Sequence, residues 1–494
     1  MLKKVKENIL SFINSDKHVP FIAAFISGFY PFVFYISNNY SAVNSKEHLA
    51  FFVLFFIGIS LLIFSLFYFG FGLNKRLIKY RAHLLFVLLI VVTSSLMSQA
   101  IYLVFKKKIL LLILILSIAL SIKLHKHYKK IIILLMLMCV LPIPKVIIKA
   151  YNYLIPMTWS VLPDEIENVQ FKHKPNIYLI QPDGYVAETM MESETYNFKS
   201  DLYGWLSIND FKIYPDFRSN YPASLASNAS LFSMKQHYFG ETLLPSLEVP
   251  NARKIISGDN PVISIFKNNN YKTYFIVEDE YFQQNRKESN YDYYNIKLNE
   301  IPLFSNDNNI KKDVFLDLKQ AISLSDKTPK FFFIEKLLPH HVHFSAEENK
   351  VETERDWYIK RVGEVNNWIK TTVNYISKVD PNAMIIILAD HGGWVGLENY
   401  NDMYSTENPY LIKSTYSSLA AVKWNGFLTS DYDANLKSNV NVFRVLFSVL
   451  SENKTYLQNL ESDSSYNLRL GLFSKSVYEV IDSNGNVNIE RLNK

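Results

Sequence analysis

Hydrophobic positions divide the chain into two regions with different patterns. The first 150 residues consist mainly of long apolar stretches, whereas short apolar runs alternate with polar segments in the rest. An apolar stretch of about 20 residues is long enough to cross a bilayer as a helix. The candidate spans are Val19–Ser37, Leu49–Leu73, His83–Phe105, Ile109–Ile122 and Ile131–Ile148. We therefore predict a transmembrane region over residues 1–151 with about five helices, while the short fourth stretch leaves four or six spans as alternatives.

Basic residues near the apolar stretches predict an orientation. Lysines precede the first stretch, and the connections at residues 75–81 and 123–130 are rich in lysine and arginine. Under the positive-inside rule these segments lie inside, which places the chain after residue 151 outside the cell. The triplet Lys106–Lys108 falls on the outer side and opposes this assignment. We expect a multi-pass plasma (inner) membrane protein, with residues 152–172 as a linker along the membrane surface.

The region from residue 173 onward has the pattern of an α/β domain. Its short apolar runs, typical of buried strands, are Asn176–Gln181, Tyr271–Val277, Lys330–Leu338 and Met384–Ala389. Segments with helical spacing lie between them, including Val262–Lys267 and Trp357–Ile376. Strands separated by long crossovers favour a mostly parallel central sheet with helices on both faces. We predict this fold for a domain spanning residues 173–494.

Charged and metal-binding residues follow each of these predicted strands. They are Asp183, Glu278 with Asp279, His340 with His341 and His343, and Asp390 with His391. Because parallel strands end at one edge of a sheet, these side chains are expected to form one site. A carboxylate oxygen and an imidazole nitrogen suit a divalent metal of the zinc or manganese type. On its own, the Asp-His-Gly motif is also consistent with an ordinary turn.

A serine at a helix start is the candidate nucleophile. The segment NYPASLASNASLFSM predicts a helix that begins near Ser224, just after Pro222. Unpaired N–H groups at a helix start stabilise an alkoxide or a bound anion. A metal held by Asp183, Asp390 and His391 would lower the pKa of the serine hydroxyl further. The alternative role for Ser224 is an ordinary helix cap.

Composition excludes several other classes of protein. The net charge of +6 is modest, and its basic residues cluster near the apolar stretches, so nucleic acid is not an expected partner. Cys139 is the single cysteine, which excludes an intrachain disulfide and a cysteine-based zinc site. The apolar stretches carry almost no charged residues that could form a transport pathway, so a transporter is disfavoured.

The order of these motifs resembles a known family. A PDG sequence after the first strand, a serine at a helix start, a histidine-rich strand end and a late ADHG sequence are similar to the sulfatase-like branch of the alkaline phosphatase superfamily. The preceding apolar stretches extend the resemblance to membrane-anchored lipoteichoic acid synthase-type phosphoglycerol transferases and phosphoethanolamine transferases. The segment around Ser224 resembles the family's NYxxTxxSLASxLNM, and residues 440–450 resemble a helix near the end of such domains. The resemblance covers about residues 175–450.

The resemblance implies a role for each motif. Asp183, Ser224, Asp390 and His391 match the metal ligands, and Ser224 also matches the catalytic nucleophile. The histidines His340, His341 and His343 stand where the family keeps a histidine that binds substrate or a second metal. In an extended segment His341 and His343 share one face while His340 points away, and His341 is favoured. The expected cofactor is zinc or manganese, as one or two ions.

The implied activity is transfer of a phosphoglycerol or phosphoethanolamine group. The donor would be a phospholipid, the acceptor a cell-envelope glycan or lipid, and the intermediate a covalent ester of Ser224. Alternatives are a membrane-anchored hydrolase of phosphate or sulfate esters and an inactive scaffold of the same fold. Serine replaces the threonine usual in the transferases. The Cys/Ser-x-Pro-x-Arg sequence of true sulfatases is absent at Ser224, so formylglycine chemistry is not expected.

Overall fold

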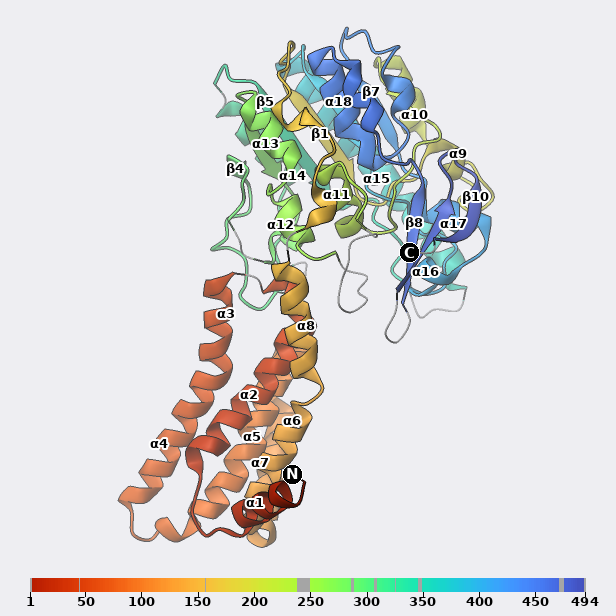
Figure 1. Ribbon diagram of the computed structural model, residues 1–494. Helices are drawn as coiled ribbons and strands as arrows, with labels where there is room; N and C mark the ends of the chain where they lie inside the picture. The colour runs from red at the N-terminus through yellow and green to blue at the C-terminus, as the bar shows by residue number, and fades with distance from the viewer. Residues whose placement is uncertain are drawn as a thin grey trace. The chain divides into compact units, whose positions relative to one another are not determined.

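The computed structural model divides the chain into two compact units, each described here by itself (Figure 1). The described residues are 2–43, 45–155, 157–237, 249–285, 288–305, 309–324, 326–344, 349–470 and 475–492. The first unit contains the chain up to Leu154 together with the short segment around Phe304, and the second contains the remainder.

The first unit is a bundle of helices around α2. Its helices are α1 (Leu2–Asn14), α2 (Pro20–Asn39), α3 (Lys46–Val53), α4 (Ile59–Leu73), α5 (Arg81–Tyr102), α6 (Lys107–Leu124), α7 (Tyr128–Met138) and α8 (Pro142–Leu154). α2 packs against α4, α5, α7 and α8. Gly28 of α2 allows a close backbone approach, because a Cβ there would lie 2.2 Å from the Phe56 carbonyl oxygen. Small residues at helix contacts are typical of membrane bundles.

Four stretches that begin in this unit are long and apolar enough to cross a membrane among the described residues: Pro20–Ala42, Lys46–Leu73, Ile78–Tyr102 and Lys107–Ser160. The fourth stretch is 54 residues long and runs through α6, α7 and α8. The fourth and fifth predicted spans both fall within it. The number of crossings and the boundaries at residues 151 and 172 therefore stay predictions.

The second unit is built on a mostly parallel sheet. In the described residues it has seven strands in the order β2-β7-β6-β1-β5-β3-β4. They are β1 (Ile177–Pro182), β2 (Lys212–Ile213), β3 (Lys272–Ile276), β4 (Tyr293–Tyr294), β5 (Lys330–Lys336), β6 (Met384–Leu388) and β7 (Ala420–Lys423). β6, β1, β5, β3 and β4 run parallel, and at one edge β7 pairs antiparallel with both β6 and β2. The predicted fold class and its four strands are confirmed.

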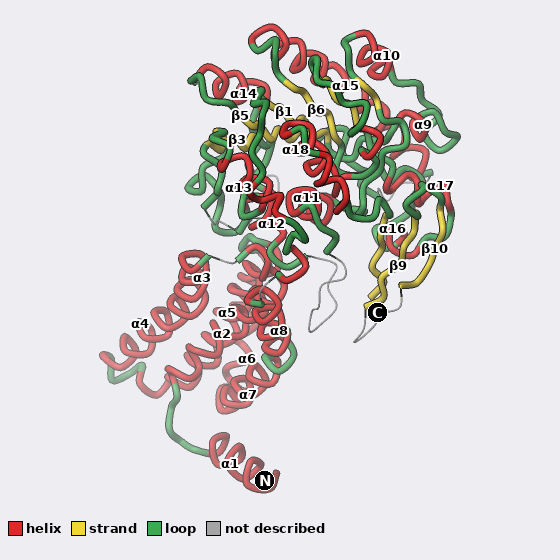
Figure 2. Tube along the Cα trace, turned by 45° about the horizontal axis from the view of Figure 1, so that its top comes forward, coloured by secondary structure: helices red, strands yellow, loops and turns green. Residues whose placement is uncertain are grey.

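Helices cover both faces of this sheet (Figure 2). One face packs against α11 (Ser224–Ser233), α12 (Ala252–Ile256), α13 (Pro261–Asn268) and α18 (Val442–Ser451). The other packs against α9 (Glu188–Met191), α10 (Asp201–Ile208), α14 (Val314–Ser323), α15 (Lys350–Val379) and α16 (Asp402–Ser405). Alternate strand residues enter the two cores, because successive side chains of a strand point to opposite faces. The fully buried central strands explain why their sequences are continuous apolar runs.

A small antiparallel sheet completes the second unit. Its strands are β8 (Ser465–Leu470), β9 (Lys475–Ile481) and β10 (Val487–Leu492). The side chains of β9 pack against α17 (Pro409–Tyr416) through a separate small apolar cluster. Arg218, in the segment after β2, contacts the turn between β9 and β10, since its guanidinium donates to the carbonyl oxygens of Asp482 and Ser483 at 3.2 and 2.8 Å.

Candidate metal centre

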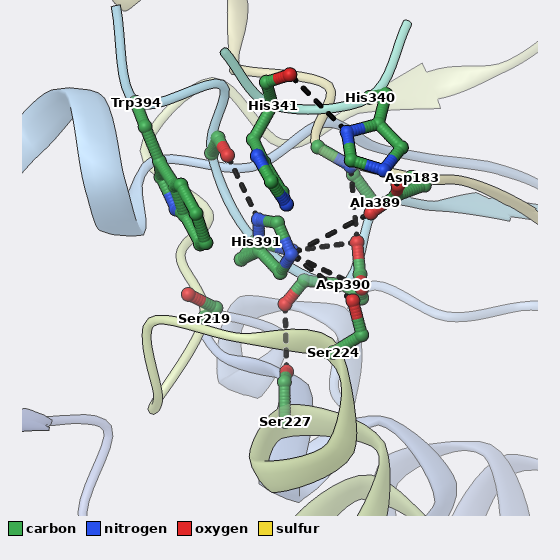
Figure 3. A network of polar contacts seen from close by, with 12 residues as sticks. Asp183, Ser219, Ser224, Ser227, His340, His341, Ala389, Asp390, His391 and Trp394 are labelled. Carbon is green, nitrogen blue, oxygen red and sulfur yellow. Dashed lines mark hydrogen bonds and ion pairs between the residues drawn. The ribbon is translucent and has the colours of Figure 1, made fainter. Parts of the chain in front are cut away.

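Two neighbouring strands bring the candidate metal ligands together. Asp183 follows β1, and Asp390 and His391 follow β6, its parallel neighbour. One oxygen of each carboxylate and one imidazole nitrogen all lie within 4.8 Å of one another, and all three residues are buried. Figure 3 shows the three side chains pointing toward one another beside Ser224. Three convergent oxygen and nitrogen donors form a set that zinc or manganese commonly uses.

Hydrogen bonds leave one oxygen of each carboxylate directed at this cluster. Asp390 Oδ1 accepts from the backbone N–H groups of Gly184 and His391 at 3.1 and 3.0 Å. Asp390 Oδ2 and Asp183 Oδ1 are buried without a hydrogen-bond partner among the described residues. Each of these two oxygens lies 3.5 Å from His391 Nε2. Because buried polar atoms are normally satisfied, the unsatisfied pair fits a bound cation.

Electrostatics favour a cation at the same position. Burial, together with the nearby Asp390 carboxylate, raises the pKa of Asp183 to about 7. Two like charges in a buried site resist simultaneous ionisation. A divalent cation would offset both carboxylates and restore their ionised forms. The residues present therefore fit a divalent metal.

The imidazole of His391 has one nitrogen available toward this site. Its Nδ1 lies 2.8 Å from the carbonyl oxygen of Gly392, so Nδ1–H donates to that carbonyl. This bond fixes the tautomer in which Nε2 carries a lone pair, the form that binds a metal. The Oγ atom of Ser224 lies 3.1 Å from Nε2. The hydroxyl, the imidazole and both carboxylates thus converge on one point.

The helix α11 positions Ser224 at its first turn. Ala223 caps the helix with extended backbone angles, and Ser224 is half-buried at the helix start. One turn later, the Ser227 hydroxyl donates to the Asp390 carbonyl oxygen at 2.6 Å. The side chain of Asn439 donates to the same carbonyl at 2.8 Å. These bonds join α11 to the end of β6 and fix the distance between the hydroxyl and the carboxylates.

Glycines let the two strand ends come close to their neighbours. Gly184 has φ +67°, a left-handed conformation that glycine adopts without strain. A Cβ at Gly393 would lie 2.4 Å from the Tyr358 ring. The Tyr358 hydroxyl donates to the Gly184 carbonyl oxygen at 2.8 Å and accepts from the Val186 N–H at 3.3 Å. Tyr358 therefore clamps the turn after β1 against the turn after β6, a contact that the sequence did not reveal.

Two of the three candidate histidines line the pocket above the cluster. His340 and His341 lie along it, whereas His343 is exposed and its Nε2 is 2.7 Å from Arg361 Nη1. The sequence-based alternation of these residues does not apply, because His340 has φ +62° and the segment is not extended. Burial lowers the pKa of His341 well below its ordinary value, so its imidazole is neutral near pH 7.

The pocket has a volume of 240 Å³. It is lined by Asp183, Ala223, Ser224, Asp279, Tyr281, Glu335, Leu337, His340, His341, His391, Trp394 and Tyr400. Trp394 is a buried lining residue that the sequence did not indicate. Its ring stacks on His341 with centroids 3.7 Å apart. Its indole N–H donates to the Pro222 carbonyl oxygen at 3.1 Å, which ties the serine loop to the turn after β6.

Comparison with known protein families gives a match over the catalytic part of the chain. Residues 206–450 match the family model for Sulfatase. The match covers α11, β5, β6 and the Asp390–His391 turn, while Asp183 precedes it. No curated protein sequence matches the chain.

Solved structures similar to the chain include the following three proteins. Lipooligosaccharide phosphoethanolamine transferase A (EptA) from Neisseria meningitidis has 11% identity and a TM-score of 0.43, covering 88% of this chain and 96% of its own. The periplasmic domain of EptC from Escherichia coli has 14% identity and a TM-score of 0.41, covering 62% and 93%. The lipoteichoic acid synthase LtaP from Listeria monocytogenes has 14% identity and a TM-score of 0.41, covering 65% and 90%.

Proposed function

We propose that the protein is a metal-dependent transferase that moves a phosphoglycerol or phosphoethanolamine group from a phospholipid to a cell-envelope glycan or lipid. The observation that carries this proposal is the 3.1 Å contact between Ser224 Oγ and His391 Nε2, beside two buried carboxylates. A hydroxyl at a helix start, next to a set of metal ligands, is an arrangement suited to nucleophilic attack on phosphorus.

Asp183, Ser224, Asp390 and His391 would hold the metal. When bound, zinc or manganese lowers the pKa of the serine hydroxyl and offsets negative charge on the phosphoryl oxygens. The N–H groups at the start of α11 stabilise the same negative charge. The His341 Nδ1–H donates to the Val342 carbonyl oxygen at 2.7 Å, so the neutral imidazole presents an Nε2 lone pair that can accept a hydrogen bond from the acceptor hydroxyl. His340 lies on the same pocket wall, so either histidine can contact the substrate.

The proposed reaction consists of two successive displacements at phosphorus. Ser224 Oγ forms a bond to the donor phosphorus, the bond from phosphorus to the diacylglycerol oxygen breaks, and the serine proton ends on that oxygen. An acceptor hydroxyl then attacks the phosphorus of the serine ester. The bond from Oγ to phosphorus breaks, and the acceptor proton returns to Oγ. Diacylglycerol and the modified acceptor are the products.

Membrane anchoring supports a lipid donor. The first unit carries four stretches long and apolar enough to cross a membrane, and phospholipid head groups lie at the membrane surface. By the positive-inside rule, the catalytic unit would lie on the extracytoplasmic side of the plasma (inner) membrane, where envelope acceptors are found.

Release of labelled diacylglycerol from phospholipid vesicles tests the proposal directly. The full-length protein with added Mn²⁺ or Zn²⁺ should release diacylglycerol and accumulate a Ser224 peptide that carries the phosphoglycerol or phosphoethanolamine group, detectable by mass spectrometry. Ser224→Ala should abolish both signals, while the neighbouring variant Ser233→Ala, at the other end of α11, should retain them. Continued release by Ser224→Ala would refute the covalent mechanism. Accumulation of the free head-group phosphate in the presence of envelope acceptors would indicate a hydrolase.

A further inference from the structure

A third buried carboxylate lies in the pocket and takes no part in the metal cluster. Glu335 lines the pocket and is only 3% exposed. Its Oε2 atom has no hydrogen-bond partner among the described residues. The nearby Glu278 is different, since its carboxylate pairs with Lys336 at 2.9 Å and accepts from the Leu337 N–H at 2.9 Å.

The sheet places Glu335 on the same face as the metal cluster and Ser224. Phe331 and Phe333 of β5 enter the core beneath α11, and Glu335 continues their alternation. On the adjacent strand β1, Gln181 is the register partner of Glu335 and donates to Asn228 of α11 at 2.9 Å. The Glu335 side chain is therefore directed to the side of the sheet where α11 lies.

The order of the strands separates this carboxylate from the metal ligands. The ligands follow β6 and β1, whereas Glu335 lies on β5 and Asp279 follows β3, the next strand across. Neighbouring strands are about 4.8 Å apart. A phosphate held at Ser224, beside Asp183, would thus share the pocket with the carboxylate of Glu335 on the adjacent strand. The two carbons of an ethanolamine ester would let the ammonium group extend toward that carboxylate.

The charge of the pocket favours a cationic occupant at this end. Among the described lining residues there are three carboxylates and neither lysine nor arginine. Burial, followed by the negative charges of Asp279 and Asp183, raises the pKa of Glu335 well above its ordinary value. A cation beside Glu335 would stabilise its ionised form and satisfy the oxygen that otherwise lacks a partner.

The ligand geometry favours an organic cation over a second metal ion. Within the residues the structure describes, the metal-type cluster consists of Asp183, Asp390 and His391, and Glu335 does not belong to it. A metal site needs three or more convergent protein donors, whereas an ammonium group has three N–H donors and binds well to one or two carboxylates. Glycerol carries no charge and would leave the carboxylate uncompensated.

We propose that Glu335 binds the ammonium group of an aminoalkyl phospholipid, which makes phosphoethanolamine the transferred group. This inference rests on the proposed function, because it assumes that the phosphate of the same donor is held at Ser224. It adds a specificity residue on β5 that acts on the head group and leaves the phosphoryl chemistry to the residues after β1 and β6.

The test compares two donors in the diacylglycerol-release assay with the full-length protein. Vesicles contain labelled phosphatidylethanolamine or labelled phosphatidylglycerol, and the metal is Mn²⁺ or Zn²⁺. The wild type should turn over phosphatidylethanolamine with a kcat/KM at least about tenfold higher. Glu335→Gln should lower that value by about 10- to 100-fold, mainly through KM, because a charge-assisted hydrogen bond is lost. Its turnover of phosphatidylglycerol should remain within about twofold of the wild type.

Glu335→Asp is the matched control, since it keeps the charge on a shorter side chain and should retain the preference for phosphatidylethanolamine. A wild-type preference for phosphatidylglycerol, or an equal loss on both lipids in Glu335→Gln, would overturn the proposal. So would a metal stoichiometry that falls from two ions to one in Glu335→Gln. If the Glu335→Gln variant does not fold, inhibition of diacylglycerol release by the wild type tests the proposal instead. Free phosphoethanolamine should inhibit this release more strongly than glycerol phosphate. The reverse order would refute the proposal.

The outcomes separate this inference from the proposed function. Loss of all turnover in Ser224→Ala, combined with no preference between the lipids, leaves the transferase proposal intact and removes the role of Glu335. Turnover that persists in Ser224→Ala removes the covalent mechanism, whichever lipid is preferred. Absence of turnover with both lipids in the wild type refutes the two proposals together.

Discussion

Replacing Asp183 by asparagine should stabilise the metal-free protein. The buried carboxylate has a pKa of about 7, against an ordinary value of 3.8, with burial and the Asp390 charge as the main causes. In the pH range between these values the folded state binds more protons than the unfolded state, so stability falls as pH rises. Above pH 7 the ionised Asp183 carboxylate lowers the free energy of unfolding by its full amount, whereas below about pH 4 it no longer lowers it. Asparagine has nearly the same shape and removes the charge.

The magnitude follows from the shift in pKa. A shift of about three units corresponds to about 4 kcal/mol at pH 8, and about 2 kcal/mol of this cost is present at pH 5.5. The Asp183→Asn variant, freed of metal with a chelator, should therefore unfold at a higher temperature than the wild type. Its advantage should be larger at pH 8 than at pH 5.5. With metal added the order should reverse, because the variant has lost a ligand and gains little from binding.

Asp433→Asn is a matched control with the opposite expected sign. Asp433 is also buried, but its carboxylate accepts from Lys212 Nζ at 2.6 Å and from the Thr429 hydroxyl at 3.0 Å. Removing its charge breaks a satisfied pair and should cost about 1 kcal/mol at both pH values. Thermal unfolding in detergent, with and without metal, measures all three proteins. If metal-free Asp183→Asn is no more stable than the wild type at pH 8, the claim that burial and the Asp390 charge destabilise the ionised Asp183 carboxylate is wrong.

Three further predictions concern the same site. Metal affinity, measured by calorimetry, should rise about tenfold per pH unit from about pH 5 to 7 and then level off. The reason is that metal binding displaces one proton from Asp183. An affinity that does not change with pH would contradict this prediction. Gly393→Ala should lower the free energy of unfolding by about 2–3 kcal/mol, since its Cβ would lie 2.4 Å from the buried Tyr358 ring. In contrast, Gly363→Ala, with open space around its Cβ in α15, should be neutral or stabilising by up to about 1 kcal/mol in denaturant unfolding. Trp394→Phe keeps an aromatic ring beside His341 but loses the indole hydrogen bond, so stability should fall by about 1 kcal/mol, and an unchanged melting temperature would argue against that bond.

The central sheet was predictable because its strands are buried on both faces. Continuous apolar runs identify β1, β3, β5 and β6, and the long segments between them require parallel crossovers. The antiparallel edge was not predictable: β2 has two residues and β7 has four, too few for a clear period. Their position depends on tertiary pairing, which leaves no mark on local sequence.

The ends of the strands were more informative than their interiors. Asp183, Asp390 and His391 interrupt apolar runs at the ends of adjacent strands, so their convergence follows from sheet geometry, and the structure brings them within 4.8 Å. Glu335 lies within β5 itself, where a charged residue in a buried strand gave no signal of the pocket beside it. The alternation expected for an extended segment does not apply at His340, because its left-handed backbone conformation cannot be read from side-chain type.

The buried carboxylates differ in the ligand that each one requires. Asp183 and Asp390 form a close pair whose repulsion a divalent metal relieves, and this relief needs no donor lipid. Glu335 lies on the next strand, and its Oε2 atom has no hydrogen-bond partner among the described residues. Metal should therefore stabilise the protein alone, whereas an aminoalkyl phosphate should add stability only in the metal-loaded protein with Glu335 intact. If the same pocket holds a metal beside the phosphate and an acid beside the amine, each charge of a zwitterionic head group would meet its complement.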